Sequence, residues 1–197
     1  MAAHAGQMVG SQGSVVRIED SPIAKILFGD VRLSWIWLVL RLYVGYEWLT
    51  AGWAKVQNPA WVGPKAGTAL AGFINGALAK TAGAHPDVQG WYAGFLHNLV
   101  LPNTALWSYV VAFGEVLVGV GLILGIFTGI AAFFGGFMNV NYLMAGTVST
   151  NPFLFVIATW LVLAWKTAGW IGLDRWVLGK LGTPWSPGQV FKTVEKK

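Results

Sequence analysis

The sequence of 197 residues contains no cysteine, and only 11% of its residues are charged. The absence of cysteine excludes disulfides, thiolate metal sites and thiol nucleophiles from the chemistry of this chain. Between Asp87 and Lys166 the only charged side chain is that of Glu115. Because a soluble domain with so long an uncharged stretch would expose large apolar patches, we expect an integral membrane protein.

The sequence also lacks the common signatures of soluble enzymes. It contains no phosphate-binding GxxxxGK, no dinucleotide-binding GxGxxG and no nucleophile elbow. Its histidines, His4, His85 and His97, fall outside the long apolar segments, so we expect neither haem nor metal in this chain. The Lys and Arg residues flank apolar segments and form no basic run, so nucleic acid is not an expected partner.

What the sequence contains instead is four long, predominantly apolar segments, each close to the roughly 20 residues that cross a hydrocarbon core. They are residues 35–53, 106–124, 127–145 and 152–170. Only helices and closed barrels satisfy their backbone hydrogen bonds in lipid, and the lengths of these segments indicate helices. We predict an all-α, polytopic membrane protein built on a four-transmembrane-helix bundle, with the lipid bilayer as its surroundings.

A long loop, residues 56–104, follows the first segment and carries two shorter apolar stripes. The first stripe consists of Leu70, Phe73, Ile74 and Leu78, and the second of Val88, Trp91, Tyr92, Phe95, Leu96 and Leu99. Their helical spacing predicts two interfacial helices at the outer membrane surface. Packing of the same two helices onto the outer end of the bundle is an alternative that the pattern leaves open.

Flanking charges predict the orientation. Lys and Arg residues are more numerous beside the two termini than in the long loop, so both termini are expected to be cytoplasmic, in a multi-pass protein of the plasma membrane. We therefore divide the chain into an N-terminal cytoplasmic arm (1–30), a four-helix membrane domain (31–176) that includes the long outer loop, and a C-terminal cytoplasmic tail (177–197).

The first apolar segment carries a polar face. Arg41, Gly45, Trp48, Gly52 and Lys55 are separated by four, three, four and three residues, so they fall on one side of a helix. The glycines predict close approach of a neighbouring backbone. An arginine that faces lipid would cost about 3 kcal/mol or more, so this face is expected to point into the bundle.

Arg41 needs a partner at membrane depth, and we predict an ion pair with Glu115, near the middle of the second segment. Such a pair could serve only to set the register of two helices, or it could line a polar pocket for an anion, a proton or a quinone head group. Arg41 and Glu115 are therefore the candidate catalytic residues, although the residues themselves identify no reaction.

The third apolar segment adds a second narrow face, on which Gly135, Asn139, Tyr142 and Gly146 are again spaced by four, three and four residues. Asn139 and Tyr142 could complete the same pocket, or they could link helices through hydrogen bonds. The predicted ligand-binding residues are Arg41, Trp48, Lys55, Glu115, Asn139 and Tyr142.

Four stretches of the chain are similar to a known family. They are RLYVGYEWLTAGWAK (41–55), GEVLVGVGLILGIFTGIAA (114–132), NYLMAG (141–146) and NPF (151–153). In these charged and glycine positions the chain resembles the DoxX family, including the DoxD-like small membrane subunits associated with thiosulfate:quinone oxidoreductase. The likeness extends over residues 31–170, which is nearly the whole apolar portion.

The resemblance implies a four-helix membrane subunit of an oxidoreductase or respiratory-type complex, which passes electrons from a reduced sulfur compound to quinone together with a partner subunit. As an enzyme it would be quinone-linked, of the thiosulfate dehydrogenase type. Arg41 and Glu115 would then poise the quinone head group, Tyr142 and Asn139 would donate hydrogen bonds to it, and Trp48 would cover its ring.

Two other functions stay open at this point. In the first, the chain is a non-catalytic anchoring or assembly subunit, whose polar face is structural and whose long loop holds a partner protein. In the second, it is a small transporter, although four helices without an evident inverted repeat argue against that function. The sequence does not decide whether the chain forms a homo-oligomer.

Overall fold

The computed structural model describes residues 20–182, and this part of the chain is helical and contains no strand. The main helices are α2 (Ser34–Val56), α5 (Thr104–Leu124), α6 (Thr128–Met144) and α7 (Asn151–Leu163). The shorter helices are α1 (Pro22–Gly29), α3 (Thr68–Leu78), α4 (Gly90–Phe95), α8 (Trp165–Ala168) and α9 (Asp174–Leu181). Single turns of tighter or wider helix are η1 (Val31–Leu33), η2 (Ala79–Thr81), η3 (Leu96–Val100) and η4 (Leu101–Asn103). The predicted all-α class is confirmed for the described residues.

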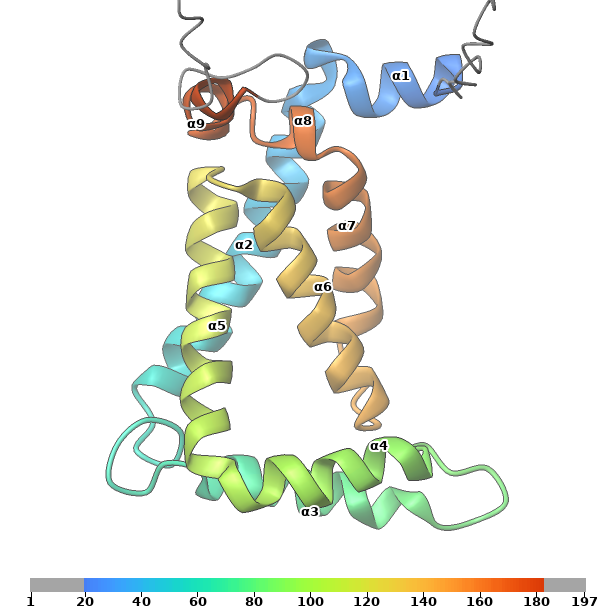
Figure 1. Ribbon diagram of the computed structural model, residues 1–197, viewed down its shortest axis with the longest axis vertical. Helices are drawn as coiled ribbons and strands as arrows, with labels where there is room; N and C mark the ends of the chain where they lie inside the picture. Colours follow the sequence, from blue (N-terminus) through green and yellow to red (C-terminus); the bar gives the residue numbers. More distant parts are fainter. Residues whose placement is uncertain (1–19, 183–197) are drawn as a thin grey trace, which may run out of the picture.

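Figure 1 shows α2, α5, α6 and α7 running between two ends of the molecule. At one end α3 and α4 lie across the bundle, and at the other end α1, α8 and α9 gather. We call these the α3/α4 end and the α8/α9 end. Each of the four predicted apolar segments therefore contains a main helix, although α7 ends at Leu163, where we had expected the helix to continue to residue 170.

Glycines bring α2 and α5 into backbone contact. A Cβ atom at Gly119 would lie 2.5 Å from the backbone nitrogen of Leu49, and one at Gly52 would lie 2.7 Å from that of Val116. Real side chains do not tolerate such distances from backbone atoms. Each of these glycines, which has no Cβ, therefore lets the backbone of the other helix approach closely. This contact confirms that the glycines of the first segment admit a neighbouring helix.

The core of the bundle lies between α2, α5, α6, α7 and α8. Its fully buried members are Trp37, Val44, Trp48, Val118, Leu122, Ala132, Leu154, Ile157, Leu161, Ala164 and Ala168. The indole of Trp37 also donates a hydrogen bond to the carbonyl of Leu27, which connects α1 to the start of α2.

At the corner between α1 and α2, exposed Arg32 donates hydrogen bonds to the carboxylate of Asp30 and lowers the pKa of that carboxylate.

A second apolar cluster holds α3 and α4 together at the α3/α4 end. Its buried residues are Leu70, Ile74, Ala77, Val88, Tyr92, Leu96, Val100 and Ala145. Half of the residues in the two predicted stripes are therefore buried between the two short helices and against α6, and Phe73, Leu78 and Phe95 are partly buried. Trp91 and Leu99, which we assigned to the second stripe, are exposed. The structure thus shows these helices covering one end of the bundle, as in the alternative arrangement, and their position at the outer membrane surface stays a prediction.

Among the described residues, one helical stretch, Gly90–Leu124, is long and apolar enough to cross a bilayer by length and composition, and Asn151–Leu163 is a shorter apolar helix. The four predicted crossings therefore stay a prediction. The same holds for the division into arm, membrane domain and tail. Residues 1–19 of the predicted arm and 183–197 of the predicted tail lie outside the described residues.

Candidate functional site

A buried carboxylate forms the centre of a polar group between α2, α5 and α6. Glu115 of α5 is 1% exposed, and each of its two oxygens has a partner from another helix. Oε2 accepts a hydrogen bond from the Lys55 ammonium at 2.6 Å, and Oε1 accepts one from the Tyr142 hydroxyl at 2.5 Å. Charge-assisted hydrogen bonds of this kind are short and strong, so the carboxylate joins Lys55 and Tyr142 into one chain.

Lys55 lies at the partly exposed end of this chain of hydrogen bonds. It lies in the last turn of α2, and its side chain keeps 21% of its surface exposed. Its ammonium nitrogen also lies 5.3 Å from the centre of the Trp61 ring, a favourable cation–π distance. The group therefore passes from partial exposure at Lys55 to full burial at Glu115.

Aromatic rings hold Tyr142 at the other end of the chain. The ring of Trp48 stacks on it with centres 6.4 Å apart, and the edge of Phe73 from α3 meets it at 6.0 Å. Contacts of this geometry stabilise a ring by roughly 0.5–1.5 kcal/mol beyond the area they bury. Tyr142 is thus fixed in orientation by two neighbours besides its hydrogen bond to Glu115.

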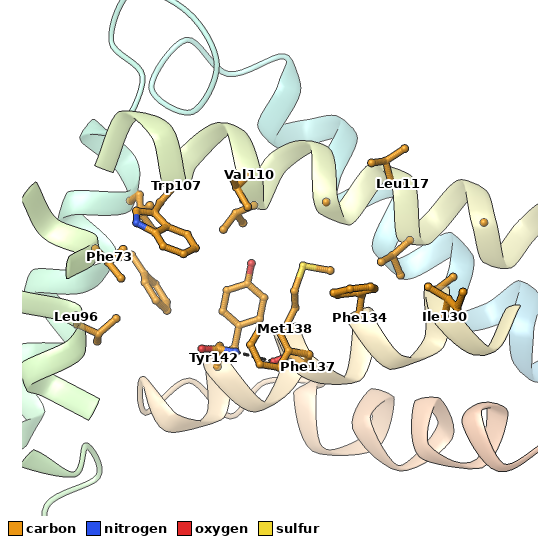
Figure 2. A pocket seen from close by; sticks show the side chains of 18 of the residues that line it. Phe73, Leu96, Trp107, Val110, Leu117, Ile130, Phe134, Phe137, Met138 and Tyr142 are labelled. Carbon is orange, nitrogen blue, oxygen red and sulfur yellow. Dashed lines mark hydrogen bonds between the residues drawn. The ribbon is translucent and has the colours of Figure 1, made fainter. Parts of the chain in front are cut away.

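Tyr142 borders a large apolar pocket between α5 and α6, with a volume of about 680 Å³. Figure 2 shows the ring of Tyr142 pointing from α6 toward α5, with Trp107 and Val110 on the facing helix and Phe73 and Leu96 at the α3/α4 end. Further lining residues are Gly114, Leu117, Gly121, Ile130, Phe134, Phe137 and Met138. Since Leu117, Ile130 and Phe134 are more than half exposed, the pocket opens sideways between the two helices.

Arg41 lies elsewhere, at the α8/α9 end. Its guanidinium is 1% exposed and donates to the carbonyl oxygens of Leu122 at 2.8 Å, Ile123 at 3.3 Å and Ile171 at 2.7 Å. The last carbonyls of a helix have no partner within the helix and carry the negative end of its dipole. Arg41 therefore closes the C-terminal end of α5 and joins it to the segment before α9.

The predicted ion pair between Arg41 and Glu115 is wrong. Leu122 lies seven residues after Glu115, which corresponds to about 10 Å along the helix axis. The prediction assumed that Arg41 lies at a similar depth to Glu115, near the middle of the second segment. However, a Cβ at Gly45 would touch Leu122 and Ile123 near the end of α5, so the first turns of α2 extend past that end. Lys55, and not Arg41, is level with Glu115.

Asp174 is a buried polar residue that the sequence did not reveal. It is 2% exposed, and its two oxygens accept hydrogen bonds from the backbone nitrogens of Phe127 at 2.6 Å and Thr128 at 2.9 Å. A carboxylate is favourable at the N-terminal end of a helix such as α6. Capping patterns are recognised from adjacent residues, whereas this cap comes from 46 residues away, so no local signal could have identified it.

Asn139 links helices and does not border the pocket. Its amide nitrogen donates to the side-chain oxygen of Asn151 at 2.9 Å, which connects α6 to α7. Its own oxygen and the indole nitrogen of Trp48 are both buried without a hydrogen-bond partner. Of the six predicted ligand-binding residues, Tyr142 lines the pocket, Glu115 and Lys55 are connected to it through Tyr142, and Trp48 packs on Tyr142. Arg41 and Asn139 are not among the residues that line it.

The histidines of the described region take no part in this group. His97 is exposed, and its Nδ1 lies 3.0 Å from the side-chain oxygen of Asn98. His85 is also exposed, in the loop between α3 and α4, and His4 lies outside the described residues. Within residues 20–182 no three His, Asp or Glu side chains gather in a way that could hold a metal ion.

Comparison with known proteins identifies a family. The model of the family described as TQO small subunit DoxD matches residues 36–191, which is most of the chain. No curated protein and no solved structure matches the sequence. The match agrees with the resemblance to DoxX-like proteins and narrows it to one branch. The chain therefore belongs to the DoxD family, the small, membrane-associated subunits of thiosulfate:quinone oxidoreductase.

Proposed function

We propose that this chain is a multi-pass membrane subunit that binds a quinone in the pocket between α5 and α6, as part of a quinone-linked oxidoreductase. The observation that carries the proposal is the pocket itself: an apolar cavity of about 680 Å³ into which the Tyr142 hydroxyl brings a polar group backed by Glu115 and Lys55. Ligand sites typically have volumes of roughly 300–1,000 Å³ and a few polar groups that orient the ligand.

The chemistry of a quinone suits this lining. Its isoprenoid tail needs an apolar channel open to lipid, which the exposed flanks of Leu117, Ile130 and Phe134 provide. Its ring can stack on aromatic side chains, and Trp107 and Phe73 both border the pocket. Its carbonyl oxygen accepts hydrogen bonds, and the Tyr142 hydroxyl, which donates to Glu115 in this structure, can donate one to it by turning about its C–O bond. The residues present therefore fit the group that the family name implies.

The membrane arrangement that goes with this function has α2, α5, α6 and α7 crossing the bilayer. The α3/α4 end then lies at the outer surface and both termini are cytoplasmic, because positive residues are concentrated beside them. Since DoxD proteins are small subunits, we assign the oxidation of the sulfur compound to a partner subunit. The electrons then reach the quinone from that partner.

A steric block tests the pocket. Gly114 lines it, and a Cβ there would meet only the sulfur of Met138, at 3.7 Å, so Gly114→Leu should fill the cavity without disturbing the fold. Gly76→Leu is the matched control, because Gly76 lies on an exposed face of α3 with no heavy atom within 4 Å. Quinone binding is measured by quenching of tryptophan fluorescence in the detergent-purified protein.

We expect Gly114→Leu to weaken quinone binding at least about tenfold, which corresponds to about 1.4 kcal/mol, and Gly76→Leu to leave it unchanged. Turnover of the native complex with thiosulfate and a soluble quinone should fall in parallel. Equal binding by wild type and Gly114→Leu would refute the quinone site in this pocket and favour the anchoring function instead.

A further inference from the structure

We infer that Lys55, Glu115 and Tyr142 form a proton-transfer path that leads from the surface at the α3/α4 end to the quinone head group. The inference rests on the proposed quinone site. It goes beyond that site because it assigns the direction from which protons arrive and the residues that carry them.

The first observation is that the path is continuous. Two hydrogen bonds, of 2.6 and 2.5 Å, connect the ammonium of Lys55, the carboxylate of Glu115 and the hydroxyl of Tyr142. Glu115 uses a different oxygen for each neighbour, so it bridges the two. Hydrogen bonds of this length are within the range over which protons transfer directly between a donor and an acceptor.

The second observation is that a buried carboxylate connects two partly exposed ends of the path. The Lys55 side chain is 21% exposed, Glu115 is 1% exposed, and Tyr142 borders the pocket. An ion pair that served only to fix helix register would need Lys55 and Glu115 alone. The hydroxyl of Tyr142 extends the pair to the cavity wall, and its single proton, donated here to Glu115, can be donated to a ligand when the hydroxyl turns.

The third observation is that the other titratable groups near the pocket do not offer a route. Tyr92 of α4 also lines the cavity, but its hydroxyl is directed to the backbone carbonyl of Asn141 at 3.0 Å, which cannot pass a proton on. His97 is exposed and is not part of the lining. The titratable groups in contact with Glu115 are Lys55 from α2 and Tyr142 from α6. The other polar side chains of the lining, those of Asn141 and Trp107, do not titrate, so we assign proton entry to Tyr142.

The reaction defines what the path supplies. Reduction of a quinone to a quinol takes up two electrons, which the thiosulfate-oxidising partner provides, and two protons. For each proton, the hydroxyl of Tyr142 turns from Glu115 to the quinone, and its O–H bond breaks as an O–H bond forms on the quinone oxygen. The Tyr142 oxygen then takes up a proton that the Lys55 ammonium gives through the Glu115 carboxylate, and the neutral Lys55 amine takes a proton from solvent. Tyr142 is therefore the group that touches substrate, and Glu115 and Lys55 act through it.

The test uses the native complex with Glu115→Gln, which keeps the size and a hydrogen-bond acceptor but cannot carry a proton. Glu47→Gln, the same change on α2 at a residue outside the path, is the control. We expect Glu115→Gln to bind quinone within about twofold of wild type, yet to lose turnover by roughly 100-fold, as removal of a proton-transferring group does. The pH dependence of turnover should flatten, and Glu47→Gln should match wild type in every readout.

Tyr142→Phe provides a second variant in case Glu115→Gln does not fold, and the same loss of turnover and of pH dependence is expected. Normal turnover and a normal pH profile in a folded variant of either residue would overturn the proton path, while normal quinone binding by that variant would leave the quinone site standing. Absence of quinone binding by the wild-type protein would overturn the site and the path together.

Discussion

At the scale of single residues, Glu115 and Arg41, two of the buried charged residues, are compensated by different kinds of hydrogen-bond partner. Glu115 has an ammonium and a hydroxyl as partners, whereas Arg41 donates to three backbone carbonyls. Burial of a charge is costly unless hydrogen bonds compensate for the lost water. Arg41 therefore stabilises the end of α5. Glu115, in contrast, is connected through Tyr142 to the pocket in which a ligand would bind.

Replacement of Arg41 should affect stability more than binding. In Arg41→Met the carbonyls of Leu122, Ile123 and Ile171 lose their donor, and buried groups without partners cost roughly 1–3 kcal/mol each. We expect a clearly lower thermal unfolding midpoint in detergent and unchanged quinone affinity of the folded fraction. Arg32→Met is the control, since an exposed ion pair such as Arg32–Asp30 contributes little. Wild-type stability together with lost quinone binding would place Arg41 at the ligand after all.

At the scale of the helix, small residues decide which pairs of helices are close and which are apart. α2 and α5 are in contact along Gly45, Gly52 and Gly119. α5 and α6, in contrast, carry Leu117, Phe134 and other large side chains where they face the pocket. The close pair forms a rigid support on which Glu115 is held, and the pair with bulky residues leaves the cavity.

Two alanine substitutions on α5 distinguish the effect of the contact with α2 from the effect of helix propensity. Gly119→Ala places a Cβ 2.5 Å from the Leu49 backbone, and overpacking of this kind costs roughly 1–3 kcal/mol. Gly114→Ala meets only Met138 and should be neutral or stabilising by up to about 1 kcal/mol, because alanine favours helix. Unfolding midpoints of the two variants provide the comparison. Equal midpoints would mean that α2 and α5 are not in backbone contact in the membrane.

At the scale of the whole molecule, the two ends of the bundle differ in construction. The α3/α4 end is covered by two helices that share an apolar cluster, and the partly exposed Lys55 lies there. At the α8/α9 end, Arg41 and Asp174 join α5, α6 and the segment before α9 through backbone groups. The proposed function needs the α3/α4 end to face the outer aqueous phase.

The absence of native cysteine makes this arrangement testable by labelling. We expect a membrane-impermeant maleimide added to intact cells to modify His85→Cys, in the loop between α3 and α4, but not Lys180→Cys on α9 or Asp20→Cys before α1. All three positions are exposed, so permeabilised cells should label all three. Labelling of His85→Cys and Lys180→Cys from the same side would contradict an arrangement with four crossings.

The sequence predicts some residues of the site better than others. The spacing of Arg41, Gly45 and Gly52 correctly placed that face toward a neighbouring helix, because a charge and small residues are unfavourable toward lipid. It did not identify the partner of Arg41, since the register between two antiparallel helices depends on where their glycines meet. Tyr142 was among the residues expected to complete a pocket, but the sequence did not indicate that the pocket would be apolar and lie between α5 and α6.

By itself, the sequence determined the helical class, the positions of the main helices and which of their faces are buried. These follow from local composition and period, which each segment carries independently of its neighbours. The tertiary structure alone decided that Glu115 pairs with Lys55, that Asp174 caps α6, and that a cavity separates α5 from α6. Each of these features depends on how far helices that are distant in the chain are shifted or diverge relative to one another. The sequence of a single segment does not determine that arrangement.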